Sequence, residues 1–301
     1  MKKLMTAAFL LIVQLCAFAQ QEGYVDNGDF KTFYRTYGKG DPLLIINGGP
    51  GMNSDGFVEI ARKLSANNRT IIYDQRGTGR SVMKELNSSN MTVDLMVDDL
   101  ERLRKSLRID KWTILGHSFG GMLASYYATK FPEHISALIL SSSGGIDLDL
   151  LAGGGGFIAE KLSRQEQDSL AYWSAKIEEG DTSYHARLRR GLALAPAYVY
   201  DKKNIPVIAE RLTQSNSRIT GLVWQNLQNI KFNCEKGLLS FNKPVLIIQG
   251  KQDIVSEKLA EKAHKVLKNS KVVLMDKCVH YGWLDNPEVY FSSVNKFLSS
   301  I

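Results

Sequence analysis

The stretch KWTILGHSFGGMLASYYATK, residues 111–130, indicates which fold this chain adopts. It begins with a near-continuous apolar run, as expected for a strand that is buried on both faces. From Phe119 onward it has the pattern of a helix. Gly116 and Gly120 allow the close backbone approach of a tight turn, so Ser118 is predicted to lie on a turn between strand and helix. Such strand–helix units build mostly parallel sheets.

Similar apolar runs occur on both sides of this stretch. Between them lie helical patterns, for example at residues 91–107, where apolar side chains form one stripe and Thr92 is a plausible N-cap. Ser256 has the same capping position in a later helix. We predict strands at 42–47, 69–74, 111–116, 135–141, 244–250 and 271–276. This alternation predicts an α/β fold, with a mostly parallel central sheet and helices on both faces.

The alternation stops between about residues 144 and 236. Ser163 and Glu166 form a capping-box pattern that begins a helix, which should end at Gly180, and another helix is expected after Asp181. Because the strand–helix rhythm then resumes, a separate domain in series fits less well than an insertion. We therefore expect a helical cap at 144–236, inserted into a core domain formed by 20–143 and 237–301.

Residues 1–19 have the pattern of a secretory signal peptide. Lys2 and Lys3 precede an apolar run that ends in Ala17-Phe18-Ala19, which predicts cleavage before Gln20. A membrane anchor is the weaker alternative, because the run is short and has no charged stop after it. The mature protein is expected to be periplasmic or secreted, without stable membrane insertion.

The composition is that of a globular protein and gives no sign of a nucleic-acid-binding one. The chain has 301 residues, of which 44% are hydrophobic and 23% charged, as in soluble globular proteins. Its formal charge of +7 is scattered, and the densest basic cluster, at 187–190, is interpreted as a solvated helix face. We therefore expect no nucleic-acid partner. Cys234 and Cys278 could pair in an exported protein or could both be free thiols; both alternatives remain open.

Ser118 is the candidate nucleophile. It follows a strand directly, and ligands of open α/β sheets bind at the carboxyl ends of the strands. A serine hydroxyl needs a neighbouring base, which is almost always histidine. His280 lies on a loop after the strand at 271–276, at the same end of the sheet. The other four histidines are excluded by position: His117 with its side chain directed elsewhere on the turn, His134 at the opposite end, His185 in the insertion and His264 within a helix.

The base in turn needs a carboxylate that orients it. Asp253 follows the strand at 244–250 and is the preferred candidate. Asp147, after the strand at 135–141, is the main reserve, and Asp149 competes from the same loop.

Two backbone amides are expected to stabilise a developing oxyanion. One belongs to Phe119, directly after the serine. The other is expected from Gly49 in the segment NGGPGM (47–52), which follows the strand at 42–47 and precedes a helical pattern. An ordinary glycine–proline turn is the alternative interpretation of this segment.

Five segments together resemble the α/β-hydrolase superfamily: NGGPG (47–51), DQRGTGRS (74–81), GHSFGG (116–121), GKQD (250–253) and the His280 loop. Within it they are most similar to the prolyl aminopeptidase (proline iminopeptidase) branch, because GGPG together with DQRGTGRS is a specific pair. The resemblance implies a serine hydrolase with a helical cap, and with neither a metal nor an organic cofactor. It supports the roles of Ser118, Asp253, His280, Gly49 and Phe119.

The resemblance also implies that Asp74 and Arg76 shape the loop beside the nucleophile. The chain departs from the family at Asn47, where histidine is usual, and in GHSFG, which is more usual among esterases and carbon–carbon bond hydrolases. Family aminopeptidases hold the substrate ammonium with cap carboxylates, whereas the matching stretch SNSRITG (215–221) offers Arg218 and no acid. The remaining candidates for this role are Glu178, Glu179 and Glu210.

These observations predict an exported serine hydrolase that acts on a small peptide or other small acyl substrate. Release of N-terminal proline or a similar residue is the first expectation, and hydrolysis of a carboxylic ester or another small molecule is the second. A serine at position 118, rather than aspartate, argues against epoxide hydrolase or dehalogenase chemistry. A non-catalytic binding protein is the alternative from another class, although binding alone does not need a complete triad.

Overall fold

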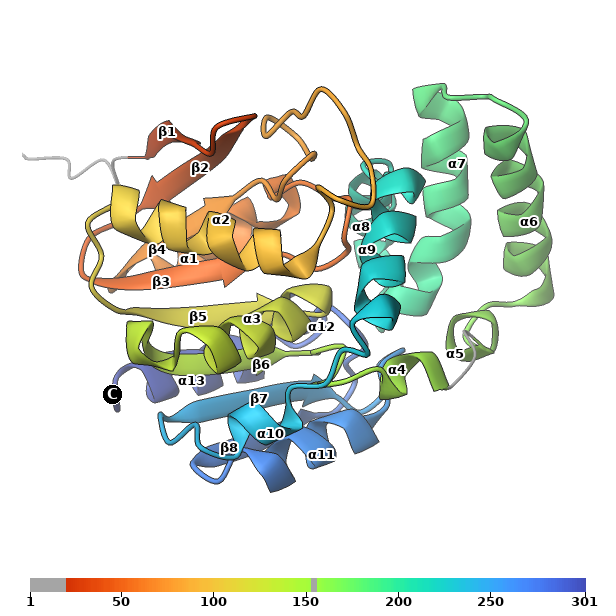
Figure 1. Cartoon of the computed structure of the whole chain (residues 1–301). Coiled ribbons are helices and arrows are strands. Elements are labelled where there is room, and N and C mark those ends of the chain that lie inside the picture. The colour runs from red at the N-terminus through yellow and green to blue at the C-terminus, as the bar shows by residue number, and fades with distance from the viewer. Residues whose placement is uncertain (1–19, 153–155) are drawn as a thin grey trace, which may run out of the picture.

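The computed structural model describes residues 20–152 and 156–301; the predicted signal peptide at 1–19 lies outside this range. Its centre is an eight-stranded sheet with the order β1-β2-β4-β3-β5-β6-β7-β8 (Figure 1). The strands are β1 (Gln21–Asp26), β2 (Lys31–Tyr37), β3 (Asp41–Ile46), β4 (Asn68–Tyr73), β5 (Trp112–His117), β6 (Ile135–Ser141), β7 (Val245–Gly250) and β8 (Ser270–Met275).

The sheet is parallel from β4 to β8 and antiparallel at its β1–β2 edge. β3 pairs in parallel with both β4 and β5, and the parallel pairing continues through β6 and β7 to β8. β1 pairs antiparallel with β2, which pairs antiparallel with β4. The α/β fold class is therefore confirmed, and all six predicted strands are present within one residue. The first two strands were not predicted.

Helices cover both faces of the sheet. Neighbouring residues of each central strand point to opposite faces, and both sets of side chains are apolar, so each face is buried under helices. In β3, Leu44 and Ile46 join an apolar cluster with α2 and α3, whereas Leu43 and Ile45 join a second cluster with α1 and α13. Figure 1 shows α3 in front of the sheet and α13 behind it. The core helices are α1 (Val58–Leu64), α2 (Val93–Ser106), α3 (Phe119–Lys130), α11 (Glu257–Val266), α12 (Gly282–Asp285) and α13 (Pro287–Leu298).

Between β6 and β7 the described residues form a group of helices at the carboxyl ends of the strands. In Figure 1 the arrowheads of the parallel strands β3 to β8 point toward α6 to α9. We call residues 149–229 the cap. Its helices are α4 (Asp149–Ala152), α5 (Gly156–Ala159), α6 (Arg164–Glu178), α7 (Tyr184–Leu194), α8 (Ile205–Leu212) and α9 (Ser217–Asn229), with short 3-10 turns η3 (Ala195–Tyr198) and η4 (Lys202–Asn204). The short helix α10 (Glu235–Leu238) that follows packs against α3 of the core.

The predicted helix boundaries in the cap are confirmed by their capping contacts. Ser163 and Glu166 form a reciprocal capping box at the start of α6, and Gly180 follows its end with a φ of +105°. In the core, Thr92 and Ser256 accept the expected hydrogen bonds at the starts of α2 and α11. These helices therefore begin at residues that local side-chain chemistry determines.

Cys234 and Cys278 are both buried and unpaired, which decides between the two alternatives in favour of free thiols. Burial raises the pKa of the Cys234 thiol to about 12, so it stays protonated at neutral pH. In the part of the chain that the structure describes, no helix has the length and apolar character needed to cross a membrane.

Candidate active site

Ser118 lies on a sharp turn between β5 and α3. Its φ of 54° and ψ of −120° lie outside the usual regions for a non-glycine residue, which costs about 1–3 kcal/mol of backbone strain. The turn is also crowded, since a Cβ added at Gly120 would lie 2.2 Å from the carbonyl oxygen of Ile46, and one at Gly116 would lie 2.3 Å from that of Gly120. The glycines of GHSFGG are therefore required by the turn, and the serine is held at the end of the sheet.

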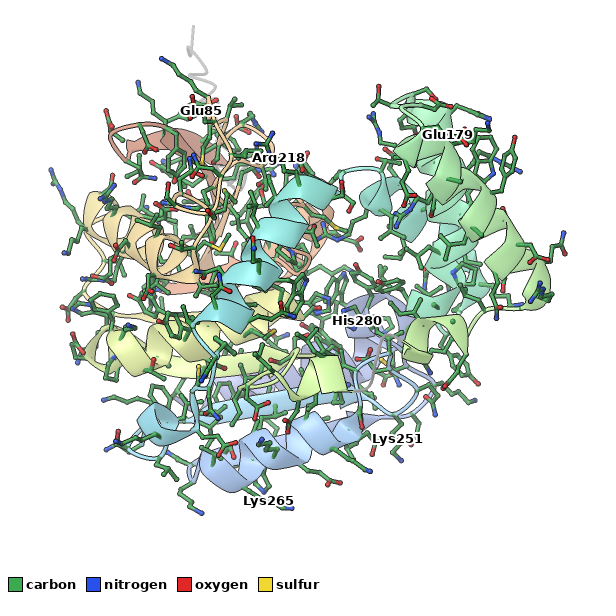
Figure 2. All side chains as sticks on the ribbon, turned by 45° about the vertical axis from the view of Figure 1, so that its right-hand side comes forward. Glu85, Glu179, Arg218, Lys251, Lys265 and His280 are labelled. Atoms are coloured by element: carbon green, nitrogen blue, oxygen red, sulfur yellow. The ribbon has the colours of Figure 1, made fainter. Side chains whose placement is uncertain are left out.

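His280 and Asp253 are in direct contact. The imidazole Nδ1 lies 2.8 Å from Oδ1 of Asp253. The side chains are 3% and 0% exposed, and the carboxylate also accepts hydrogen bonds from Nε2 of Gln249 at 2.9 Å and from the backbone N–H of Val255 at 3.2 Å. A buried carboxylate held in this way fixes the imidazole tautomer that carries its proton on Nδ1, which leaves Nε2 as the basic nitrogen. Figure 2 shows His280 between the sheet and the cap.

Ser118 and His280 line one cavity of about 600 Å³, together with Gly48, Gly49 and Phe119. Phe119 is the first residue of α3, so its N–H is at the positive end of the helix dipole. A Cβ added at Gly48 would lie 2.7 Å from Cβ of Ser118, so the loop backbone passes directly beside the serine. The positive φ of +72° at Gly49 is one that a glycine adopts without strain. The arrangement can present a hydroxyl, a base and amide donors to one carbonyl group.

Two of the polar side chains that hold the glycine-rich loop and its continuation are Asn47 and Asp74. Nδ2 of Asn47 donates to the carbonyl oxygen of Met52 at 3.0 Å, which closes the loop without the histidine that is usual in the family. Asp74 accepts from the backbone N–H and the hydroxyl of Ser54, at 2.9 and 2.7 Å, and from the N–H of Arg80 at 2.8 Å. Asp74 thus joins the loop after β3 to the loop after β4.

Arg76 holds the same loop from another side. Its guanidinium forms a two-point ion pair with Asp99 of α2, with Nε and Nη2 at 2.8 and 2.9 Å from the two carboxylate oxygens. Both side chains are almost fully buried. Arg76 therefore attaches the loop at 74–81 to α2.

His117 occupies a place that the sequence did not predict. Its side chain was expected to point elsewhere, but it lines the same cavity, with its ring 4.7 Å from that of His280. Burial, and then the nearby His280 and Arg211, lower the pKa of His117 well below its usual value. The ring is therefore neutral at pH 7 and contributes packing beside the base.

The other excluded histidines lie outside the cavity lining. His134 contacts Glu101, His185 contacts Trp173 of the cap, and His264 contacts Ser270. Asp147, the reserve acid, is paired with Lys262 of α11, which also bridges Asp149 and Glu235 at 2.8 Å each. Of the candidate acids, Asp253 is the one that contacts His280.

The cavity is lined mainly by apolar side chains. Among the described residues that line it, polar groups other than Ser118 and the two histidines come from Gln228 and from two tyrosines, and none is a carboxylate. The apolar lining residues include Met52, Met122, Leu150, Leu151, Ile158, Leu212, Trp224, Ile254 and Val255.

The acidic cap residues proposed to hold an ammonium lie elsewhere. Glu178 lines a separate cavity of about 170 Å³ with Arg187 and Arg190. Glu179 pairs with Lys176 at 2.9 Å and lies toward the outer tip of the cap in Figure 2. Glu210 is exposed and accepts a hydrogen bond from Tyr184. The cavity beside Ser118 therefore receives no negative charge from these residues. In the described ranges, no three histidine, cysteine or acidic side chains are grouped as a metal ion would require.

Contacts between the cap and the His280 loop were not found from the sequence. The backbone N–H of His280 donates to the carbonyl oxygen of Tyr198 at 3.1 Å. Asp285 accepts from the N–H groups of Val279 and Tyr200, at 2.9 Å each, and so joins the loop to the segment after η3. No local pattern reveals these contacts, because their partners are about 80 residues apart in the chain.

A family model for the alpha/beta hydrolase fold matches residues 41–287. A proline iminopeptidase from Clostridioides difficile is 27% identical over 93% of this chain and 98% of its own length. Among solved structures, a proline iminopeptidase from Mycobacterium smegmatis superposes with a TM-score of 0.72 at 20% identity, covering 93% of this chain and 98% of that one. An esterase from Exiguobacterium antarcticum gives a TM-score of 0.72 at 18% identity, with 93% and 100% covered.

Proposed function

This chain belongs to the α/β-hydrolase fold family, and we propose that it is a serine hydrolase that uses Ser118, His280 and Asp253 as its catalytic triad. The observation that carries the proposal is the buried contact of 2.8 Å between His280 and Asp253 in a cavity that Ser118 also lines. Its hydrolase activity agrees with the family and with relatives named proline iminopeptidase.

The proposed reaction proceeds through an acyl-enzyme. Oγ of Ser118 attacks the substrate carbonyl carbon while its proton passes to Nε2 of His280, and Asp253 stabilises the imidazolium. The oxyanion accepts hydrogen bonds from the N–H groups of Gly49 and Phe119. The intermediate collapses, and His280 protonates the leaving group. Water then gives a proton to His280 and attacks the acyl carbon. When this second intermediate collapses, Oγ of Ser118 leaves and takes the proton from His280, which restores the enzyme.

The geometry best supports a carboxylic ester with an uncharged, apolar acyl group as substrate. Burying an unpaired ammonium in a largely apolar cavity costs several kcal/mol, and no carboxylate of the described residues lines this one. This reverses the order of the two substrates that the sequence favoured. The curated relatives support the second candidate, which is removal of N-terminal proline.

A substrate pair that differs in one charge separates these candidates. We expect p-nitrophenyl butyrate to be hydrolysed with a kcat/KM at least about 100-fold higher than p-nitrophenyl 2-aminobutyrate, because the second carries an α-ammonium without a partner. L-proline-p-nitroanilide, assayed beside them, should release little nitroaniline. The Ser118→Ala variant corrects for background hydrolysis. A higher kcat/KM for the prolyl anilide than for the neutral ester would reject the ester proposal in favour of the aminopeptidase.

Export through the signal pattern at 1–19 is part of the proposal and rests on the sequence. The intact mass of the protein recovered from outside the cytoplasm should correspond to a chain that begins at Gln20. Recovery of the uncleaved chain in the cytoplasm would contradict export.

A further inference from the structure

Arg211, from the cap helix α8, reaches the glycine-rich loop beside the serine. Its side chain is buried, with the residue 4% exposed. Nη2 donates to the carbonyl oxygen of Gly48 at 2.9 Å, and Nε donates to the hydroxyl of Tyr281 at 3.3 Å. The guanidinium carbon lies 4.8 Å from the centre of the Phe57 ring. One side chain of the cap thus contacts both the glycine-rich loop and the residue next to His280.

The charge of Arg211 has no carboxylate partner within 4.0 Å among the described residues. The other buried arginines do have one: Asp55 at 2.6 Å from Arg35, and Asp99 and Glu101 at 2.8 Å from Arg76 and Arg104. Residues 1–19 and 152–157, whose side chains the structure does not describe, include no aspartate or glutamate that could pair with Arg211. Burying a charge that is not neutralised is unfavourable, so the guanidinium is held by its neutral partners. These are the carbonyl oxygens of Gly48 and Asn53, the hydroxyl of Tyr281 and the ring of Phe57.

The contact with Gly48 acts on the proposed oxyanion donor through one peptide bond. The carbonyl group of Gly48 and the N–H group of Gly49 belong to the same peptide unit, which is planar and trans, so that the two groups point in opposite directions. A guanidinium on the carbonyl oxygen therefore directs the N–H, together with Nδ2 of Asn47, which donates to the same oxygen at 3.2 Å. It also polarises the amide and makes the N–H a stronger donor.

We propose that Arg211 is a positioning residue that completes the oxyanion hole from the cap. It holds the Gly48–Gly49 peptide with its N–H directed at the reacting carbonyl, so this donor is in place when the cap is seated on the core. The inference rests on the proposed function. It extends the active site to a residue of α8 that does not line the cavity.

The test compares Arg211→Met with Arg218→Met, a matched control from the same cap. Nη2 of Arg218 also donates to a core-loop carbonyl oxygen, that of Leu86 at 2.7 Å, but Arg218 is exposed. In Figure 2 it lies near Glu85, away from His280. We expect Arg211→Met to lower kcat on the preferred ester by about 100-fold, with KM within about threefold, because an oxyanion donor acts in the transition state. Arg218→Met should leave both parameters within about twofold.

Binding of a trifluoromethyl ketone that matches the acyl group provides a second readout, because its adduct with the serine carries an oxyanion. Its affinity should fall in proportion to kcat/KM in Arg211→Met and stay unchanged in Arg218→Met. A rise in KM with an unchanged kcat, or full affinity for the ketone, would show that Arg211 only shapes the cap and would overturn the proposal.

Arg211→Lys keeps the inference testable if Arg211→Met does not fold. It keeps the charge but loses the fork that reaches two partners, so we expect kcat to fall about 10-fold with little change in KM. A wild-type kcat in Arg211→Lys would overturn the proposal. Failure of the proposed function has a different signature, which is equal turnover by the wild type and Ser118→Ala.

Discussion

The contact of His280 with Asp253 favours this carboxylate over Asp147 for the proposed role of orienting the base. Sequence position favoured Asp253 but left Asp147 in reserve, because both follow strands at the same end of the sheet. In the structure Asp253 meets Nδ1 of His280 at 2.8 Å, whereas Asp147 is paired with Lys262. The chain has five histidines, and elimination by position selected His280, although His117, which was excluded because its side chain was expected to point elsewhere, lines the same cavity.

Replacing Asp253 by asparagine should lower kcat about 10³- to 10⁴-fold, because the amide no longer stabilises the imidazolium or its tautomer. Asp147→Asn is the matched control, and its kcat should stay within about twofold of the wild type. Steady-state kinetics on the preferred ester measure both. A larger loss in Asp147→Asn than in Asp253→Asn would show that the acid had been assigned to the wrong strand.

Arg211 shows which site residues cannot be found from the sequence. It lies in RLTQ, within an ordinary amphipathic helix, and no motif marks it. Its role depends on where α8 packs, because its partners Gly48 and Tyr281 are 163 and 70 residues away in the chain. The serine turn, in contrast, is specified locally by the glycines at 116 and 120.

The predicted strands are those whose burial can be read directly from their own residues. The six parallel strands are buried on both faces and read as continuous apolar runs. β1 has the sequence QEGYVD and is mostly exposed at the edge of the sheet, so it lacks such a run. Gly120 was predicted from its own turn, but it is also required by a second element, because an added Cβ would collide with the carbonyl oxygen of Ile46 at the end of β3. The residues of the turn do not reveal this second reason.

Glu101 of α2 joins three elements of the core through its carboxylate. It accepts hydrogen bonds from Nε and Nη2 of Arg104 at 2.8 Å each, from the hydroxyl of Tyr127 in α3, and from Nδ1 of His134 at 3.1 Å, at the end of η2 (Pro132–His134). Burial raises the pKa of this carboxyl, but the hydrogen bonds from Arg104 and Tyr127 outweigh it and lower the pKa to about 2.

Glu101 should therefore stabilise the fold against acid over a defined range. Because its folded pKa is depressed, its contribution is fully present above the ordinary value of 4.5 and is lost as the pH falls through about 2. Urea unfolding of the wild type and Glu101→Gln from pH 2 to pH 7 should show a difference in midpoint that is largest above pH 5 and shrinks steadily below it. A difference that grows on acidification would contradict this account.

In the whole molecule, the proposed active site lies where the cap meets the carboxyl ends of the strands. Its cavity takes residues from the loops after β3, β5, β7 and β8 and from several cap helices. The sequence predicted the core loops, because each follows a strand. It did not predict the apolar character of the cavity. Most of the cap side chains that line it come from α4, α5, α8 and α9, and how these helices pack against one another is decided by tertiary contacts.

The central claim is that the hydroxyl of Ser118 is a nucleophile activated by His280. It is tested most directly by treating the protein with a fluorophosphonate probe at pH 7 and measuring the intact mass, followed by peptide mapping. The account predicts that the wild type gains one probe, on the peptide that contains Ser118, and that Ser118→Ala gains none. Equal modification of the two proteins, or a probe attached at another residue, would contradict it.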